Sequence, residues 1–155
     1  MPTRQLERQL TEFIAKFKPE MGKLIRAARS KMRSLMPQAL ELVYDNYNFF
    51  VIGYGPTEKA GDAIFSLAAQ PKGLSLCFLQ GARLPDPHKL LRGNGNVVRN
   101  IHLESADGLD DPNVRQLIDI ALNRAKTRIP VDGRHRLIIK SISAKQRPRK
   151  SLKKK

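Results

Sequence analysis

The sequence predicts an α+β fold with two N-terminal helices, an antiparallel β-sheet of about five to six strands, and a closing C-terminal helix packed on one face of the sheet. Three observations lead to this prediction. Apolar residues recur every three to four positions as far as Pro37, alternate in short runs between residues 40 and 104, and recur with a helical period again after Asp111. With 155 residues, the chain is long enough to form one domain with its own hydrophobic core.

Two helices are expected before Pro37. The first covers residues 4–17, where the apolar side chains fall on one helical face, and Pro19 interrupts it. The second runs from about residue 20 to residue 35, and Pro37 stops it. The outer face of the second helix carries four basic residues, which are Lys23, Arg26, Arg29 and Arg33.

Five segments rich in β-branched and aromatic residues are predicted strands. Turn signals at residues 45–46 and 70–73 leave no room for a helical crossover, so neighbouring strands are expected to be antiparallel. The longest connection, residues 81–96, contains several glycines and prolines and is predicted to be a loop. The predicted strands are residues 40–44, 49–54, 63–69, 74–79 and 97–104.

The closing helix is expected to begin at Asp111-Pro112. An aspartate can accept the free N–H groups of the first turn, and proline suits the first helical position. The helix extends to about Lys126, where Arg124 and Lys126 complement the helix dipole. After a turn, residues 137–142 are predicted as a last strand.

Residues 1–144 are predicted to be a single domain, and residues 145–155 a basic disordered tail. The apolar pattern ends after Ala144, and the segment that follows contains seven basic residues and no acidic one. The whole chain has 29 Lys and Arg against 14 Asp and Glu, which gives a formal charge of +15. This charge favours polyanionic partners such as DNA or RNA.

The composition also constrains the compartment. Cys77 is the only cysteine, so no intramolecular disulfide can form, and the N-terminus lacks the apolar segment of a secretory signal. No uncharged apolar run approaches the ~18 residues that a membrane span needs. We therefore expect a cytoplasmic protein that has no membrane partner and is a monomer or a homodimer.

Three segments of the sequence resemble the bacterial YdhG-like family, a family of domains of unknown function. They are residues 41–68, 76–105 and 109–118, and the motifs LQGARLPDP (79–87) and GNGNVVRNI (93–101) are the most specific to the family. The resemblance, over roughly residues 10–127, implies a compact α+β domain with an antiparallel sheet, similar in outline to frataxin. One branch of the family is described as a frataxin-like iron chaperone. Frataxin-type iron binding is associated with an acidic helix surface, whereas the second helix of this chain is basic.

Motifs for catalysis, nucleotide binding and metal binding are absent from the sequence. Neither glycine-rich turn has the third glycine of a dinucleotide-binding loop, and no phosphate-loop pattern occurs. The three histidines and Cys77 are scattered, without the spacing of a zinc site. We expect no catalytic residue, no metal and no cofactor.

Two groups of side chains are candidates for binding. Polar and aromatic residues near the first hairpin are predicted to line a ligand pocket, with hairpin packing as the alternative; they are Tyr44, Asp45, Tyr47, Tyr54, Glu58 and Asp62. Basic residues of the second helix, the long loop and the strand after it are predicted to bind nucleic acid or another anion, with a solvated basic surface as the alternative; they are Lys23, Arg26, Arg29, Arg33, Arg83, Arg92 and Arg99.

These observations favour a non-enzymatic binding or interaction module of the YdhG-like family over an enzyme. One alternative is non-specific nucleic-acid binding through the basic helix and the tail. Another, implied by the resemblance, is a frataxin-like iron or metal chaperone. A small-molecule enzyme that uses the Tyr44 to Asp62 region is a further alternative, which a deep pocket holding a carboxyl group of displaced pKa would favour.

Overall fold

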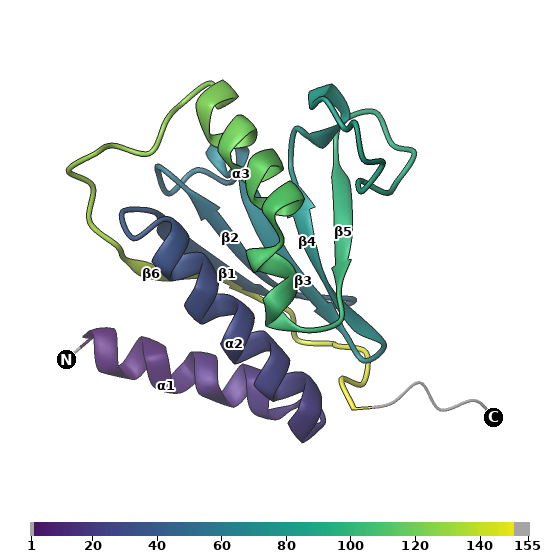
Figure 1. Cartoon of the computed structure of the whole chain (residues 1–155). Coiled ribbons are helices and arrows are strands. Elements are labelled where there is room, and N and C mark those ends of the chain that lie inside the picture. Colours follow the sequence, from purple (N-terminus) through teal and green to yellow (C-terminus); the bar gives the residue numbers. More distant parts are fainter. Residues whose placement is uncertain (1, 151–155) are drawn as a thin grey trace.

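The computed structural model describes residues 2–150 and has the predicted α+β fold (Figure 1). Two N-terminal helices come first, a mostly antiparallel sheet follows, and a helix and a last strand complete the chain. The helices are α1 (Pro2–Ala15), α2 (Pro19–Leu35) and α3 (Pro112–Arg124). The strands are β1 (Leu40–Asp45), β2 (Phe50–Gly55), β3 (Phe65–Gln70), β4 (Gly73–Phe78), β5 (Arg99–Leu103) and β6 (Leu137–Ile142). Three short 3₁₀ turns are η1 (Ala60–Asp62), η2 (Gly81–Arg83) and η3 (Ala106–Asp110).

The sheet has the strand order β5-β4-β3-β2-β1-β6. The pairings from β1 to β5 are antiparallel, as the short turns predict, but β6 pairs parallel to β1, with Leu42 opposite Ile138. The predicted antiparallel sheet is thus confirmed for β1 to β5, and β6 extends it as a parallel edge strand. The chain leaves β5 at one edge and passes through α3 and a long connection to the other edge, which gives the crossover that a parallel pair requires.

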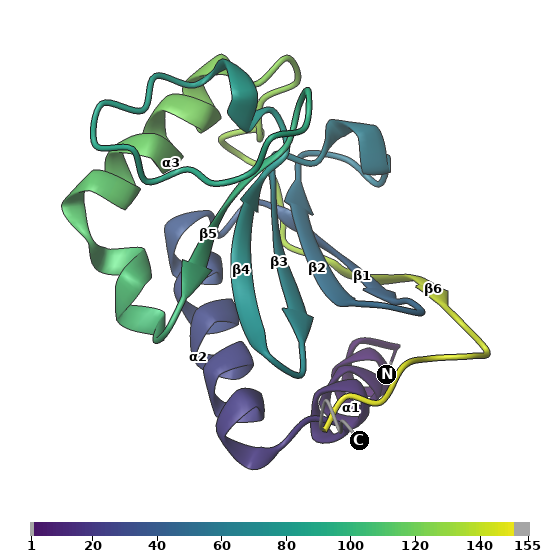
Figure 2. The same cartoon turned by 90° about the vertical axis from the view of Figure 1, so that its right-hand side faces the viewer.

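One face of the sheet is covered by α2 and α3, while α1 packs near the β1–β6 edge (Figure 2). Alternate residues of β2 point into this layer, and Phe50, Ile52 and Tyr54 are each at most 1% exposed. The ring centroids of Phe13 from α1 and of Phe17 just after α1 each lie 6.2 Å from that of Phe50. The helical and strand periods predicted from the sequence thus meet in one core.

Helix α3 begins where the Asp-Pro signal predicts. The Asp111 carboxylate accepts hydrogen bonds from the backbone N–H groups of Asn113 and Val114, and Pro112 occupies the first turn. Apolar side chains on one face, including Leu117 and Ile118, are buried in the core. This packing brings the C-terminal end of α3 next to the end of β4 and the start of β3.

Residues 145–150 of the predicted tail contact the folded domain. Arg149 is only 4% exposed, and the backbone N–H of Arg147 donates to the Tyr47 carbonyl. The sequence alone does not show that the buried Asp45 carboxylate accepts a hydrogen bond from Arg149 in the folded chain. Residues 151–155, which complete the predicted tail, lie outside the described residues. Within residues 2–150, no helix has the length and apolar character that crossing a membrane requires.

Candidate functional site

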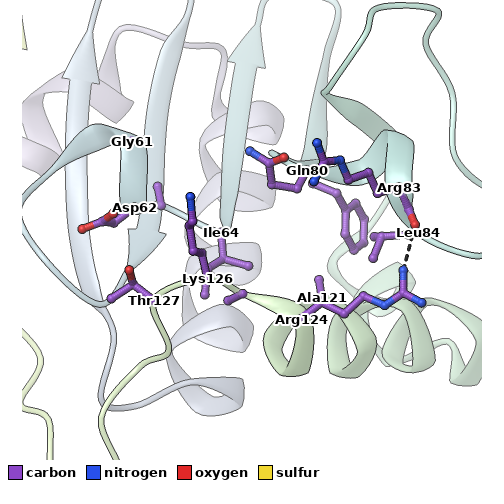
Figure 3. Close-up of a pocket in the computed structure, with 13 residues that line it drawn as sticks. Gly61, Asp62, Ile64, Gln80, Arg83, Leu84, Ala121, Arg124, Lys126 and Thr127 are labelled. Atoms are coloured by element: carbon purple, nitrogen blue, oxygen red, sulfur yellow. Dashed lines mark hydrogen bonds between the residues drawn. The ribbon is translucent and has the colours of Figure 1, made fainter.

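A pocket of about 670 Å³ lies between the C-terminal end of α3 and the ends of the central strands, and we call it the α3 pocket (Figure 3). Its apolar side chains come from the segment before β3, from β4, from the residue after η2, and from α3 itself. They are Ala63, Ile64, Phe78, Leu84, Ala121 and Ala125, the last of which directly follows α3. Polar and charged residues complete the lining, and polar atoms provide almost as much of the pocket surface as apolar atoms do, so apolar and charged groups both face the pocket.

Three cationic residues, Arg83, Arg124 and Lys126, line this pocket together with one acid, Asp62. Figure 3 shows Lys126 and Asp62 on one side and Arg83 and Arg124 on the other. Within residues 2–150, none of the three cations forms a salt bridge. One Asp62 carboxylate oxygen accepts a hydrogen bond of 2.6 Å from the Thr57 hydroxyl. The pocket therefore carries net positive charge available to a ligand.

Close backbone packing holds the walls of the α3 pocket. A Cβ added to Gly81 would lie 2.6 Å from the Cβ of Arg99, so only glycine lets η2 lie this close to β5. On the other side, a Cβ on Gly55 would lie 2.8 Å from the Cα of Ala63, which places η1 against β2. The guanidinium of Arg124 donates to the Arg83 carbonyl at 2.8 Å and links α3 to η2. Three separate segments are thus fixed around the pocket.

The six residues predicted to line a pocket near the first hairpin do not come together. Asp62 alone lines the α3 pocket. Tyr54 and Asp45 are buried and hydrogen-bonded inside the fold, whereas Tyr47 is 51% exposed. Tyr44 is half-buried, and Glu58 forms a surface salt bridge with Arg136. Alternating side chains of a strand point to opposite faces, which separates Tyr44 from Asp45.

The seven residues of the predicted anion-binding surface also lie in several separate places in the structure. Lys23 and Arg26 are exposed on α2, as predicted, and Arg83 lines the α3 pocket. Arg29 does not belong to a solvated face, because its side chain is only 14% exposed and lies between two carboxylates. The remaining three make local contacts: Arg33 lies beside His135, Arg92 is bridged through its backbone to Asn100, and the Arg99 guanidinium donates to the carbonyls of Gly95 and Val98.

The partners of Arg29 form a second notable arrangement, which we call the Glu41 cluster. It consists of Glu7, Arg29, Glu41, Tyr54 and His135. Glu41 on β1 is 0% exposed and accepts hydrogen bonds from the Arg29 guanidinium at 2.8 Å and from the Tyr54 hydroxyl at 2.8 Å. Its Oε1 also lies 2.7 Å from the Nε2 atom of His135. The second edge of the Arg29 guanidinium donates to both oxygens of Glu7 at 2.9 Å.

The Glu41 cluster changes the pKa of its members strongly. Burial opposes ionisation of Glu41, but hydrogen bonds from His135, Arg29 and Tyr54 and the Arg29 charge outweigh it and lower the pKa of Glu41 to about 2. Burial also raises the pKa of Tyr54 well above its ordinary value. These are the displaced groups that a catalytic site would offer. Here, however, they are bonded to one another and Glu41 has no access to solvent, which is typical of a structural network.

Metal binding and nucleophilic chemistry by a thiol find little support in the described residues. Among residues 2–150, no three His, Cys, Asp or Glu side chains are grouped so as to hold a metal ion. Cys77 is partly buried on β4, and burial raises the pKa of its thiol, which keeps it in the less nucleophilic form.

Sequence reasoning missed part of the α3 pocket. Arg124 and Lys126 were assigned only to the helix dipole, and Gln80 to no role. The available signal was the pair of cations at the end of a helix that must pack on the sheet, but their position opposite Arg83 depends on the tertiary fold.

Comparisons with models of known protein families, with curated proteins and with solved structures found no match to this chain. The resemblance to the YdhG-like family therefore stays a prediction from the sequence.

Proposed function

We propose that this chain is a non-enzymatic binding module and that the α3 pocket holds an anionic ligand with an apolar body. The observation that carries the proposal is the combination of apolar side chains with three cations and one acid in a single pocket lining. An apolar lining supplies most of the binding energy of a small molecule, and a few charged groups orient it. Its anionic group would face Arg83, Arg124 and Lys126.

The charge of the α3 pocket favours an anionic ligand over a cationic one. Within residues 2–150, Arg83, Arg124 and Lys126 form no salt bridge, while Asp62 already accepts a bond from Thr57. A guanidinium offers a planar pair of donors to carboxylate, sulfonate or phosphate oxygens, and Lys126 adds a mobile point charge. The carboxyl and phenol groups whose pKa values are strongly displaced, Glu41 and Tyr54, do not line this pocket. This separation supports binding over acid–base chemistry at this site.

A fluorescent aromatic sulfonate, 1-anilinonaphthalene-8-sulfonate, tests the proposal because it is an anion with an apolar body. We expect saturable binding to the natural chain and at least tenfold weaker binding to the double variant Arg83→Gln/Lys126→Gln. The matched control, Lys23→Gln/Arg26→Gln, removes the same charge from the exposed face of α2. Equal weakening by both double variants would show that the probe responds to net charge and would contradict the assignment to the α3 pocket.

Non-specific nucleic-acid binding is a second candidate, favoured by the formal charge of +15 and by the exposed Lys23 and Arg26. Polyanion binding of this kind weakens steeply as the salt concentration rises, because the release of condensed counterions then gains less free energy. Titration of a labelled RNA at several salt concentrations should give a shallower salt dependence for Lys23→Gln/Arg26→Gln than for the natural chain. Identical salt slopes would remove α2 from the nucleic-acid surface.

The sequence also led to predictions about the family, the location, the oligomeric state and metal delivery. Membership of the YdhG-like family, a cytoplasmic location, and a monomeric or homodimeric state are consistent with the proposed binding module. A frataxin-like role in metal delivery is implied only by the family resemblance. Anaerobic calorimetric titration with ferrous ion tests that role, because a metal chaperone must give saturable heat.

A further inference from the structure

The C-terminal segment after β6 lies across the β1–β2 turn, with bends at residues 144–145 and 149–150. The backbone N–H of Ser143 donates to the Asp45 carbonyl, and that of Arg147 to the Tyr47 carbonyl, both at 2.9 Å. The Gln146 amide donates to the Asp45 carbonyl at 2.8 Å and accepts a hydrogen bond from Lys16 at 2.9 Å. The segment is thus held mainly by main-chain and amide contacts.

One side chain of this segment enters the protein. The Arg149 side chain is 2% exposed, while its neighbours Pro148 and Lys150 are exposed. Its Nη2 atom donates to the Asp45 carboxylate at 2.8 Å and to the Asn46 carbonyl at 2.6 Å. An exposed strand of peptide with a single deep side chain is how a bound peptide is usually anchored.

The cavity that receives Arg149 is built entirely by other parts of the chain, and we call it the arginine socket. Asp45 is 0% exposed and ends β1, the carbonyls of Asn46 and Phe49 belong to the turn after it, and the guanidinium centre lies 5.9 Å from the ring centroid of Phe17 at the end of α1. A buried carboxylate, carbonyl oxygens and an aromatic face together suit a guanidinium group. Lys16 holds the second Asp45 oxygen at 2.7 Å and so fixes the carboxylate.

Arg149 does not use all of its hydrogen-bond donors in the arginine socket. The Nε and Nη1 atoms of Arg149 are buried and have no hydrogen-bond partner within residues 2–150. Buried unpaired donors weaken the binding of the group that carries them. The socket therefore holds Arg149 with less than the full hydrogen bonding that a guanidinium can make.

From this geometry we infer that the arginine socket is a binding site for an arginine-bearing extended peptide, occupied in the free protein by the chain's own residues 143–150. The ligand class is a basic segment whose arginine reaches Asp45 while its main chain contacts the β1–β2 turn. The tether from β6 to Arg149 is short, so the chain's own arginine is present at an effective concentration on the order of millimolar. A peptide in solution binds measurably only when this internal competitor is weakened.

The experiment uses the full chain carrying Arg149→Ala and a fluorescein-labelled peptide with the sequence of residues 143–150. We expect saturable binding, by fluorescence anisotropy, at least tenfold tighter to this variant than to the natural chain, because the variant's socket is vacated. A peptide with lysine in place of its last arginine has the same charge, and we expect it to bind at least tenfold more weakly, because an ammonium is shorter, more strongly hydrated and lacks the planar face that lies over the Phe17 ring.

Each of the following three outcomes would contradict the inference. Equal binding to the natural chain and to Arg149→Ala would mean that the peptide binds elsewhere. Equal affinity of the arginine and lysine peptides would mean that only charge is recognised. Absence of saturation up to about 1 mM peptide would mean that there is no site. If Arg149→Ala is unfolded alone, circular dichroism with added peptide decides: the arginine peptide should restore the folded signal and the lysine peptide should not, and failure of the arginine peptide to do so would contradict the inference.

Discussion

The Glu41 cluster and the α3 pocket use charged side chains in opposite ways. In the Glu41 cluster, Glu41 and Arg29 are withdrawn from water and saturated with partners, and the cluster joins α1, α2, β1 and the connection before β6. In the α3 pocket, three cations line the same cavity as apolar side chains and, within residues 2–150, have no acidic partner. Removing one partner of a buried, fully paired charge destabilises the fold, whereas charges left to solvent are available for recognition.

The largest expected effect comes from breaking the buried pair. Glu41→Gln removes the charge that Arg29 needs while keeping the size of the side chain, so we expect a loss of about 3–5 kcal/mol in the free energy of unfolding, measured by urea denaturation. Glu7→Gln is the matched control. Glu7 is 38% exposed in its side chain, and its pair with Arg29 should contribute about 1 kcal/mol or less. Similar losses for both variants would show that burial does not distinguish the two carboxylates.

The pH dependence of stability tests the same cluster without a mutation. The pKa of Glu41 is about 2 in the folded chain against an ordinary value of 4.5. Because the folded pKa is lowered, its contribution is fully present above about pH 4.5 and is lost as the pH falls towards 2, in total on the order of 3 kcal/mol. The difference in urea midpoint between the natural chain and Glu41→Gln should therefore shrink from pH 5 to pH 2. A constant difference would exclude Glu41 as the titrating group.

A backbone substitution sharpens the description of the α3 pocket. Gly81→Ala would place a Cβ 2.6 Å from the Cβ and 3.0 Å from the backbone nitrogen of Arg99, so η2 and β5 must separate. We expect a loss of about 1–3 kcal/mol, as for overpacking, together with weaker binding of the aromatic sulfonate. Gly95→Ala is the control in the same loop, because nothing lies within 4 Å of its added Cβ. If Gly81→Ala leaves both stability and probe binding unchanged, the wall of the pocket is not held by this contact.

Much of this fold is predictable from local sequence. The helices and strands follow from the change in apolar period near Pro37, and the start of α3 follows from Asp111-Pro112. The parallel pairing of β6 with β1 was not predicted, because strand identity does not reveal which edge of the sheet a distant strand joins. A local pattern describes what each segment forms, and the choice of neighbours depends on the whole chain.

The charged sites were predicted less well, for the same reason. The helical pattern placed Arg29 on the outer face of α2, but Glu41 lies beneath it on β1. A single acid between Leu40 and Leu42 is the signal that was available, because a carboxylate in an apolar strand must find partners. The α3 pocket offers only a weaker signal, the cations Arg124 and Lys126 at the C-terminal end of the closing helix, because Arg83 on η2 is far from them in the sequence.

A smaller loss is expected from the cap of α3. Asp111→Ala leaves the N–H groups of Asn113 and Val114 without their acceptor, which should cost about 1 kcal/mol in thermal or urea unfolding. Asp119→Ala removes an exposed acid from the middle of the same helix and should change stability by less than about 0.5 kcal/mol. A larger loss for Asp119→Ala than for Asp111→Ala would contradict the capping role.

The smallest effect, and one of opposite sign, is expected at the rim of the α3 pocket. Arg83→Gln/Lys126→Gln removes two cations from a chain of formal charge +15 without breaking a salt bridge within residues 2–150, so self-repulsion should fall and stability should rise by a few tenths of a kcal/mol. Salt screens the same repulsion, so the gain should vanish at about 1 M salt. Urea midpoints of the natural chain and the double variant at low and high salt measure this. A salt-independent loss of about 1 kcal/mol or more would instead mean that these cations hold the fold, as Arg29 does.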